Sequence, residues 1–489
     1  MIFMLYHRPE GKSLLFPPHY EDSMKKCLLA LLFALTLTAC QKQDEPTQSK
    51  TQTAAESTVT QTQSLPETTV TPSEPAALKS LFNEPIEATR IERPSAALPF
   101  WRDAAGGSRP ALVLYSIHPF LQPLADEQTE ELRELVATGT PEIFHQRGSY
   151  FRVDPALLPT QTVSTALDSN LFSELVWIIP STSTPDQLSL DQFRSQVVEA
   201  GFLTEEEGAQ LTMNEGSFTG TVRGLPFKAI HHMAIQELDS PAIVHLDLSF
   251  FKGMYTNEIK TPLYPLLSQV ASDLKPLNWQ VHAVTLSYST AESELSLETR
   301  FMINRFAELL GNPAMLEQDM PKAWNLHSEA LYTINFFLET KVTELYERAI
   351  KEAPEDAAVL YGLALRKLRD NNLGEALSLI DRAVAQDSGY AYEYLSLADR
   401  AGQSNDLQNA LMLLEKGRPY FKDNPFIDVQ RANLLLNMGK LEEGRALIRE
   451  LQKLPWSERV HANARESLAN MLAWEPQDPA SSPNEDSKQ

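Results

Sequence analysis

Small residues recur in this chain at a spacing of 34 residues, and this register limits the possible folds of the C-terminal part more than any other feature. Three series share the spacing: Ala330, Ala364, Ala398 and Ala432; Val342, Ala376, Ala410 and Gly444; and Ala349, Ala383 and Gly417. Bulky apolar residues follow the same period at Tyr346, Ile380, Leu414 and Ile448. Two helices approach closely where their side chains are small, so the pattern predicts a stack of helix pairs.

The period and the placement of small residues resemble the tetratricopeptide repeat (TPR), in which two helices form each unit. We expect four repeats at 323–356, 357–390, 391–424 and 425–458, with a capping helix near 459–473. The tryptophan and proline of the TPR consensus are mostly missing here, so the resemblance rests on spacing and helical period. A generic helical bundle is the alternative, but it does not explain the register. The sequence therefore predicts an all-α, TPR-like repeat domain over residues 320–475.

Residues 81–315 show a different pattern, in which short apolar runs alternate with amphipathic segments. The apolar runs predict strands at 111–117, 175–179, 220–230, 242–251 and 280–287. The amphipathic segments predict helices at 126–136, 189–200, 261–274 and 297–310. Continuous apolar strands that alternate with helices are typical of an α/β domain with a largely parallel sheet.

The stretch from Met24 to Ala39 has the features of a secretory signal and ends directly before Cys40. Two lysines precede an apolar run that is shorter than the ~20 residues of a membrane-spanning helix. The residues Leu-Thr-Ala-Cys at 37–40 resemble the lipobox of bacterial lipoproteins, in which the cysteine is lipid-modified and becomes the first mature residue. Residues 1–23 are then expected to precede the true start of the protein.

The segments that flank the two predicted domains have the composition of disordered chain. Residues 40–80 are rich in Gln, Thr, Ser, Pro and Glu, which predicts a disordered tether behind the lipidated cysteine. Residues 476–489 predict a disordered acidic tail. Gln41 follows the cysteine, and in Gram-negative bacteria this favours an outer-membrane lipoprotein that faces the periplasm.

Charge and cysteine content exclude several classes of function. The formal net charge of −23 repels phosphate backbones, so nucleic-acid binding is not expected. The chain has two cysteines, of which Cys27 lies in the signal and Cys40 carries the lipid. Disulfides and Cys-ligated metals are therefore not expected in the mature chain. The usual nucleotide-binding, zincin and α/β-hydrolase motifs are also missing from the sequence.

Polar residues alternate with apolar ones along two of the predicted strands. His245, Asp247 and Ser249 would share one face of the first strand, since successive side chains on a strand point to opposite sides. Thr285, Ser287 and Ser289 show the same alternation on the second strand and are candidate pocket residues. His245 and Asp247 could ligate one divalent metal if His118, just past the first strand of the domain, supplies a third ligand. The alternative is a hydrogen-bonded pair in the core.

The order of these strand motifs resembles the arginase/deacetylase-like α/β family over about residues 110–310. The family's uncharacterised branch carries Asp-x-Asp-x-Asp on the corresponding strand, and the resemblance implies a metal-dependent amide or amidine hydrolase. Only Asp247 keeps the acidic character, because His245 and Ser249 stand where the family has carboxylates. A binuclear centre needs several anionic ligands, so the resemblance implies a degenerate domain with one metal or none.

Three functions are compatible with the sequence. The first is a lipid-anchored scaffold of the cell envelope that binds a protein or peptide partner in the groove of its repeats, and it is not an enzyme. The second is a periplasmic metal-dependent hydrolase that requires His118, His245 and Asp247 to converge in a pocket. The third is a small-ligand binding module on an inactive enzyme fold. The repeats and the predicted lipid anchor favour the scaffold.

Overall fold

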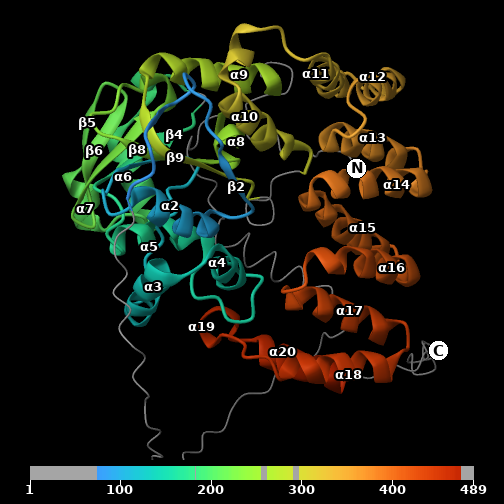
Figure 1. Ribbon diagram of the computed structural model, residues 1–489. Coiled ribbons are helices and arrows are strands. Elements are labelled where there is room, and N and C mark those ends of the chain that lie inside the picture. The colour runs from blue at the N-terminus through green and yellow to red at the C-terminus, as the bar shows by residue number, and fades with distance from the viewer. Residues whose placement is uncertain (1–73, 182, 255–261, 290–296, 475–489) are drawn as a thin grey trace, which may run out of the picture. The chain divides into compact units, whose positions relative to one another are not determined.

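The computed structural model describes residues 74–181, 183–254, 262–289 and 297–474 (Figure 1). These residues belong to one compact unit. The predicted upstream extension, the signal, Cys40, the tether up to residue 73 and the acidic tail lie outside the described residues. Within the described ranges, no helix is both long enough and apolar enough to cross a membrane.

A mixed sheet forms the centre of the N-terminal part, and the described residues contribute nine strands to it. The strands are β1 Lys79–Ser80, β2 Thr89–Ile91, β3 Ala111–Tyr115, β4 Glu174–Ile179, β5 Thr212–Asn214, β6 Ser217–Val222, β7 Leu225–His231, β8 Ala242–Asp247 and β9 Gln280–Ser287. Their order is β1-β9-β8-β3-β4-β7-β6-β5, and β2 also pairs with β9.

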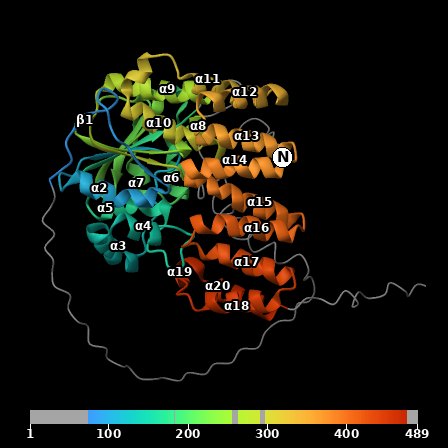
Figure 2. The same cartoon turned by 45° about the vertical axis from the view of Figure 1, so that its right-hand side comes forward.

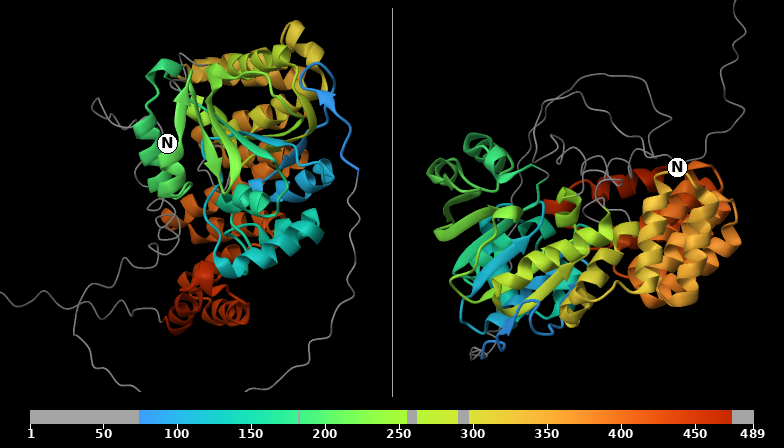
Figure 3. Two further views of the ribbon diagram at one scale, coloured as in Figure 1. Left: turned by 90° about the vertical axis from the view of Figure 1, so that its left-hand side faces the viewer. Right: turned by 90° about the horizontal axis from the view of Figure 1, so that it is seen from above.

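Five neighbouring strands of this sheet run parallel, in the order β7-β4-β3-β8-β9. The chain passes outward from β3 to β4 and β7, then returns to the other side of β3 for β8 and β9. This is the doubly wound arrangement, with a topological switch point between β3 and β8. Every residue of β3 and β8 is buried, because helices cover both faces of the sheet (Figure 3). The predicted α/β fold with a largely parallel sheet is confirmed.

Amphipathic helices connect the strands and bury their apolar stripes against the sheet. They are α2 Leu98–Ala105, α3 Asp126–Thr138, α4 Pro141–Arg147, α5 Thr162–Asp168, α6 Leu190–Glu199, α7 Glu205–Gln210, α8 Ser249–Met254, α9 Leu263–Leu274 and α10 Phe301–Gly311. Leu267 of α9 and Phe306 of α10 lie in the same core as Val113 and Val244. The chain therefore encloses the parallel strands between apolar helix faces.

Two of the predicted strands were wrong in extent. The single strand expected at 220–230 is a hairpin of β6 and β7, which turns at Arg223 and Gly224. Both turn residues have positive φ, 49° and 76°, as tight hairpin turns require. The strand expected at 242–251 ends at Asp247, and α8 begins at Ser249. Ser249 is therefore a helix residue and not the third member of a strand face.

Two other segments also differ from the sequence prediction. The helix expected at 297–310 begins only at Phe301, after the 3-10 turn η6 Leu297–Thr299. Strand β1 lies inside the predicted tether, where Ser80 pairs with Gln280 at the edge of the sheet. Two residues without apolar alternation gave no strand signal, because pairing with β9 alone determines their conformation.

Four antiparallel helix pairs follow α10 along the chain, stacked one after another (Figures 1 and 2). They are α11 Lys322–Ile334 with α12 Glu339–Glu352, α13 Ala357–Arg369 with α14 Leu373–Gln386, α15 Tyr392–Gln403 with α16 Leu407–Gly417, and α17 Pro425–Asn437 with α18 Leu441–Gln452. The short helix α19 Glu458–His461 and α20 Ala464–Ala473 close the stack. The predicted TPR-like, all-helical C-terminal part is confirmed.

The small residues of the 34-residue register are buried where the helices of the stack meet. This holds for Ala330, Ala349, Ala364, Ala376, Ala383, Ala398, Ala410, Gly417, Ala432 and Gly444. At Gly444, an added Cβ would lie 2.9 Å from the Leu436 side chain, which is too close. At Gly417, it would lie 3.1 Å from the Leu395 side chain. Residue size at these positions sets how closely the helices pack.

The turn between the two helices of each repeat contains one residue in the left-handed conformation. The four residues are Phe337 (φ 56°), Asn371 (58°), Asn405 (58°) and Gly439 (76°), each 34 positions from the next. Asn and Gly tolerate this conformation, whereas a bulky side chain is disfavoured in it. The first repeat is therefore the exception.

Candidate functional site

The polar residues predicted on β8 and β9 do meet. The two strands are parallel neighbours, and their register places His245 opposite Thr285 and Asp247 opposite Ser287. Since alternate residues of a strand point to one face, the four side chains lie on the same side of the sheet. All four are fully buried.

A chain of hydrogen bonds connects His245 to an indole on one side and a hydroxyl on the other. Trp101 Nε1 donates to Thr285 Oγ1 at 2.9 Å. Thr285 Oγ1 lies 2.9 Å from His245 Nδ1, and Ser287 Oγ lies 3.1 Å from His245 Nε2. A neutral imidazole with its proton on Nε2 satisfies all three contacts, because Thr285 then donates to Nδ1 and Ser287 accepts from Nε2.

The chain of hydrogen bonds ends on the carboxylate of Asp247. Ser287 and Ser289 both donate their hydroxyls to Asp247 Oδ2. The backbone N–H of Ser249 donates to Asp247 Oδ1 at 2.9 Å. Each carboxylate oxygen therefore accepts at least one hydrogen bond, as a buried carboxylate requires.

Burial dominates the electrostatics of this network. It lowers the pKa of His245 to about 3, so the imidazole is neutral near pH 7. It raises the pKa of Asp247, and the hydrogen bonds from Ser249, Ser287 and Ser289 act in the opposite direction. None of these groups reaches solvent, so Ser287 has no route to a substrate despite its contacts with His245 and Asp247. We interpret the network as a satisfied polar core.

His118 does not join this network. It follows β3, lies 6.2 Å from the Phe202 ring between ring centroids, and has a pKa lowered to about 4 by burial and by the charge of Lys252. Among the described residues, no three His, Cys, Asp or Glu side chains are placed to hold a metal ion. The predicted ligand set of His118, His245 and Asp247 is therefore not brought together as a cluster among these residues.

The switch point of the sheet nevertheless lies beside the predicted residues. Ligands of doubly wound folds bind outside the carboxyl ends of the strands at this point. Here β3 continues into Ser116 to His118, and β8 ends at Asp247. The backbone N–H of Ile117 donates to Ser249 Oγ at 3.3 Å across the junction. A hydroxyl of α8 thus joins the two strand ends.

Sequence reasoning missed Trp101 entirely. It lies on α2, a helix that was not predicted, and its ring packs edge-on against His245 with centroids 5.3 Å apart. The chain around it reads Leu-Pro-Phe-Trp, which is short and carries no clear helical period. The proline at the start of a helix was the available signal.

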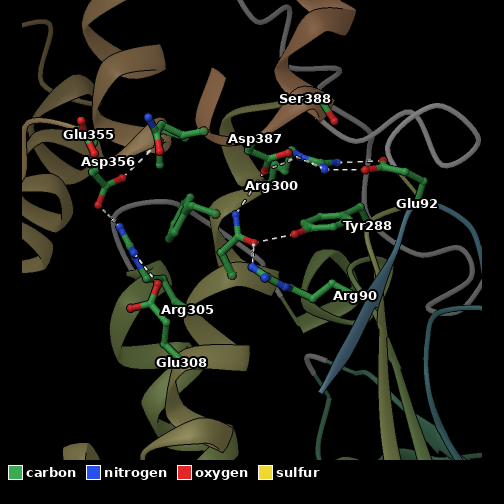
Figure 4. A pocket seen from close by; sticks show the side chains of 15 residues that line it. Arg90, Glu92, Tyr288, Arg300, Arg305, Glu308, Glu355, Asp356, Asp387 and Ser388 are labelled. Carbon is green, nitrogen blue, oxygen red and sulfur yellow. Dashed lines mark hydrogen bonds and ion pairs between the residues drawn. The ribbon is translucent and has the colours of Figure 1, made fainter. Parts of the chain in front are cut away.

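A polar cavity of about 460 Å³ lies where α10 meets the ends of the repeat helices (Figure 4). Arg300 is its central cation, with 2% of its side chain exposed. Its guanidinium donates to both oxygens of Asp387 at 2.8 Å and to Glu92 at 2.5 and 3.0 Å, and it lies over the Tyr288 ring at 3.6 Å. Although burial opposes ionisation, Arg300 holds the pKa of Asp387 below its usual value.

Arg305 of α10 forms a second contact of the same kind, five residues after Arg300. It pairs with Asp356 and with Glu308, the latter at 2.7 Å, and lies 4.7 Å from the Trp324 ring centroid. Asp356 caps α13 by accepting from Ala358 N at 3.1 Å, and Asp387 caps the turn before α15. Arg300, the N-cap residue of α10, and Arg305 within α10 thus bind the N-cap carboxylates of successive repeats.

The other end of the repeat stack also contacts the N-terminal part. His461 Nε2 lies 2.7 Å from the carbonyl oxygen of Arg152, and Arg459 donates to the carbonyl of Pro155 at 2.7 Å. The backbone N–H of Ser457 donates to the carbonyl of Val153 at 3.0 Å. The stack is therefore fixed to the α/β part at both ends.

Comparisons with known proteins leave the family open. No family model matches this chain, and no curated protein matches it. Among solved structures, the chain is similar to one titled "Crystal structure of APC/C hetero-tetramer Cut9-Hcn1", at 11% identity and a TM-score of 0.23. That match covers 46% of this chain and 42% of the other. The fold therefore defines the class, a doubly wound α/β part joined to TPR-like repeats.

Proposed function

We propose that this chain is a lipid-anchored interaction protein of the cell envelope whose helical repeats bind a protein or peptide partner. The observation that supports this most strongly is the stack of four helix pairs in a 34-residue register. Stacked helix pairs present an extended surface whose residues can change without loss of the core, which suits them to binding. The sealed network around His245 gives no comparable support to catalysis.

The lipid anchor comes from the signal and from Cys40. Lipid attachment would hold the folded part at the membrane, and Gln41 favours the periplasmic face of the outer membrane. Intact-mass measurement of the processed protein tests this step. We expect a mass that corresponds to cleavage before Cys40 plus a lipid, and a Cys40→Ser variant should lose both.

The partner surface is expected on the parts of the repeats that the α/β part leaves uncovered. The first helices are partly covered, since α11 contacts α9 and α13 contacts η6. Met412 on α16 and Tyr420 after it are large apolar side chains that are 40% and 48% exposed. These two residues of the third repeat are candidate anchors for a partner.

Crosslinking in intact envelopes, followed by affinity purification, tests partner binding. The wild-type chain should retain a defined partner that the Met412→Ser, Tyr420→Ser double variant loses at least tenfold. A Lys453→Ser variant serves as the matched surface control and should retain the partner. If the double variant and the wild type retain the same proteins in equal amounts, the third repeat is not the binding surface.

A metal-dependent amide or amidine hydrolase in the periplasm is the second candidate. The position of His118 and Asp247 beside the topological switch point favours it, while the sealed hydrogen bonds of His245 disfavour it. Metal analysis of chelator-free protein, wild type beside Asp247→Ala, separates the two functions. One equivalent of metal that the variant loses would support the hydrolase, whereas no metal in either would favour the interaction protein.

A further inference from the structure

The turn of the first repeat carries two apolar residues at positions where its three counterparts carry polar residues or glycine. The left-handed position holds Phe337 where the others hold Asn371, Asn405 and Gly439. The next position is the N-cap of the second helix, and it holds Leu338 where the other repeats hold Asn372, Asp406 and Lys440.

Two of the three counterparts of Leu338 cap their helix through the side chain. Asn372 accepts from Glu375 N, and Asp406 accepts from Asn409 N, whereas Leu338 and Lys440 make no side-chain cap. The first repeat alone therefore combines a bulky residue in the left-handed conformation with an uncapped helix. Residues that disfavour their own backbone conformation persist where another role selects them.

The residues at and beside this turn expose apolar surface. Phe337 is 82% exposed, Leu338 51%, Phe336 44% and Tyr332 40%. The Tyr332 and Phe336 rings contact each other with centroids 5.1 Å apart. We call these four residues the apolar knuckle. Phe336, Phe337 and Leu338 form the turn between α11 and α12, and Tyr332 lies in the last turn of α11.

Ion pairs lie beside the knuckle. Glu339 pairs with Arg366 at 3.2 Å and with Arg369 at 2.5 Å. Lys341 pairs with Glu329 at 3.0 Å. These five side chains are two acidic and three basic ones, in a chain whose net charge is −23. A locally basic balance lets this point approach anionic lipid headgroups that an acidic surface would repel.

The size of the knuckle favours lipid over protein as its occupant. From the exposed fractions of its side chains, its apolar area is roughly 400 Å². A standard protein interface needs about 800 Å² from each partner. A membrane has no such threshold, because aromatic side chains at a turn can enter the interfacial layer individually.

We propose that the apolar knuckle inserts into the bilayer to which Cys40 anchors the chain, as a second and weaker membrane contact. This inference rests on the proposed lipid anchor. Membrane attachment through two weak signals is stronger than through either alone, because the first holds the second close to the surface. From its composition, the part of the predicted tether before residue 74 is expected to span roughly 30–35 Å as a flexible coil, which would permit this approach.

A fluorescent probe at the knuckle tests the proposal on the full processed protein. Phe337→Cys is labelled with an environment-sensitive fluorophore, and the protein is placed in phosphatidylcholine vesicles that contain spin-labelled lipid. The matched control is Asn405→Cys, which carries the probe at the same turn position of the third repeat. We expect at least twofold quenching of the probe at 337 and none at 405. Adding Phe336→Ser and Leu338→Ser should abolish the quenching.

Two outcomes would overturn the proposal. Equal emission from the two positions in vesicles would show that the knuckle stays in water. A blue shift in the emission of the 337 probe without vesicles, increasing with protein concentration, would instead show that a second copy of the chain covers the knuckle. A failure of the lipid anchor is recognised separately, because an unmodified Cys40 would take up a second label that mass spectrometry detects.

Discussion

Asp247 shows how hydrogen bonds can satisfy a carboxyl group that is buried in a sheet. Its oxygens accept hydrogen bonds from Ser287, Ser289 and the backbone of Ser249. His245 is neutral, because burial lowers its pKa to about 3. The network therefore stabilises the junction of β8 and β9 near pH 7 and becomes unfavourable when its imidazole is forced to take up a proton.

Stability should consequently fall in mild acid. Burial lowers the pKa of seven of the described histidines below the usual 6.5, to about 3 in His245, to about 4 in His118, His232 and His327, and to a smaller extent in His145, His231 and His461. A depressed folded-state pKa gives stability that is complete above pH 6.5 and is lost as the pH falls toward the folded values. Each histidine contributes a slope of up to ~1.4 kcal/mol per pH unit.

Urea unfolding between pH 7.5 and 4.5 checks this prediction. The free energy of unfolding of the wild type should decrease with falling pH, and His245→Gln should show a smaller slope by about one proton. The raised pKa of Asp247 acts with the opposite sign, because it adds stability as the pH falls. An unchanged slope in His245→Gln would show that this imidazole is not buried in its neutral form.

Gly389 is required by the guanidinium of Arg300. A Cβ at this position would lie 2.0 Å from Arg300 Cζ, so Gly389→Ala must displace the arginine from Asp387. We expect a loss of about 2–4 kcal/mol in the free energy of unfolding, since a buried ion pair would be broken. Gly374→Ala is the control, because no atom lies within 4 Å of the added Cβ there and alanine favours the helix.

At the scale of elements, the sequence predicts best where a side-chain pattern determines the structure. The 34-residue register identified the helix pairs because residue size at Ala364 or Ala398 directly controls helix contact. It could not identify the hairpin at Arg223 and Gly224, where two adjacent positive φ angles divide one apolar run. Nor could it place the end of β8, since His245 to Phe251 alternates equally well through the start of α8.

The turn of the first repeat should become more stable when it is made like the others. Phe337→Gly removes a left-handed bulky residue, and Leu338→Asp restores a helix cap, so each should add about 1 kcal/mol to the free energy of unfolding. Thermal melts of the two variants check this, with Asn371→Phe as the reverse substitution. A loss of stability in Phe337→Gly would mean that the ring packs within the molecule.

At the scale of the whole molecule, Arg300 at the N-cap of α10 and Arg305 within α10 connect the α/β part to the repeats. Arg300→Ala would leave Glu92 and Asp387 without their shared cation, at a loss of about 3–5 kcal/mol. We expect calorimetry to show separate transitions for the two parts in an Arg300→Ala, Arg305→Ala double variant. Arg133→Ala breaks only the surface pair with Asp168 and should leave one transition. A single transition in the double variant would show that other contacts couple the parts.

The candidate site could be predicted in its members but not in its geometry. His245, Asp247, Thr285 and Ser287 were recognised from alternation, and adjacency of β8 and β9 brings them together. Their burial depends in part on Trp101, which lies on α2 in a distant part of the sequence and donates a hydrogen bond to Thr285. Contacts between segments so far apart cannot be read from a local pattern. For this reason the sequence suggested metal ligands, whereas the structure shows a buried hydrogen-bonded network.

Attachment at both ends has a consequence for how this protein can evolve. A free solenoid can gain or lose a repeat, since only its neighbours are affected. Here the contact of α11 with α9 at one end and the backbone hydrogen bond from Ser457 to Val153 at the other close the chain into a ring. If a repeat were inserted or deleted, the last repeat would move by the thickness of one helix pair, and Ser457 would no longer reach Val153. The number of repeats between the two attachments is thus a fixed dimension of the molecule.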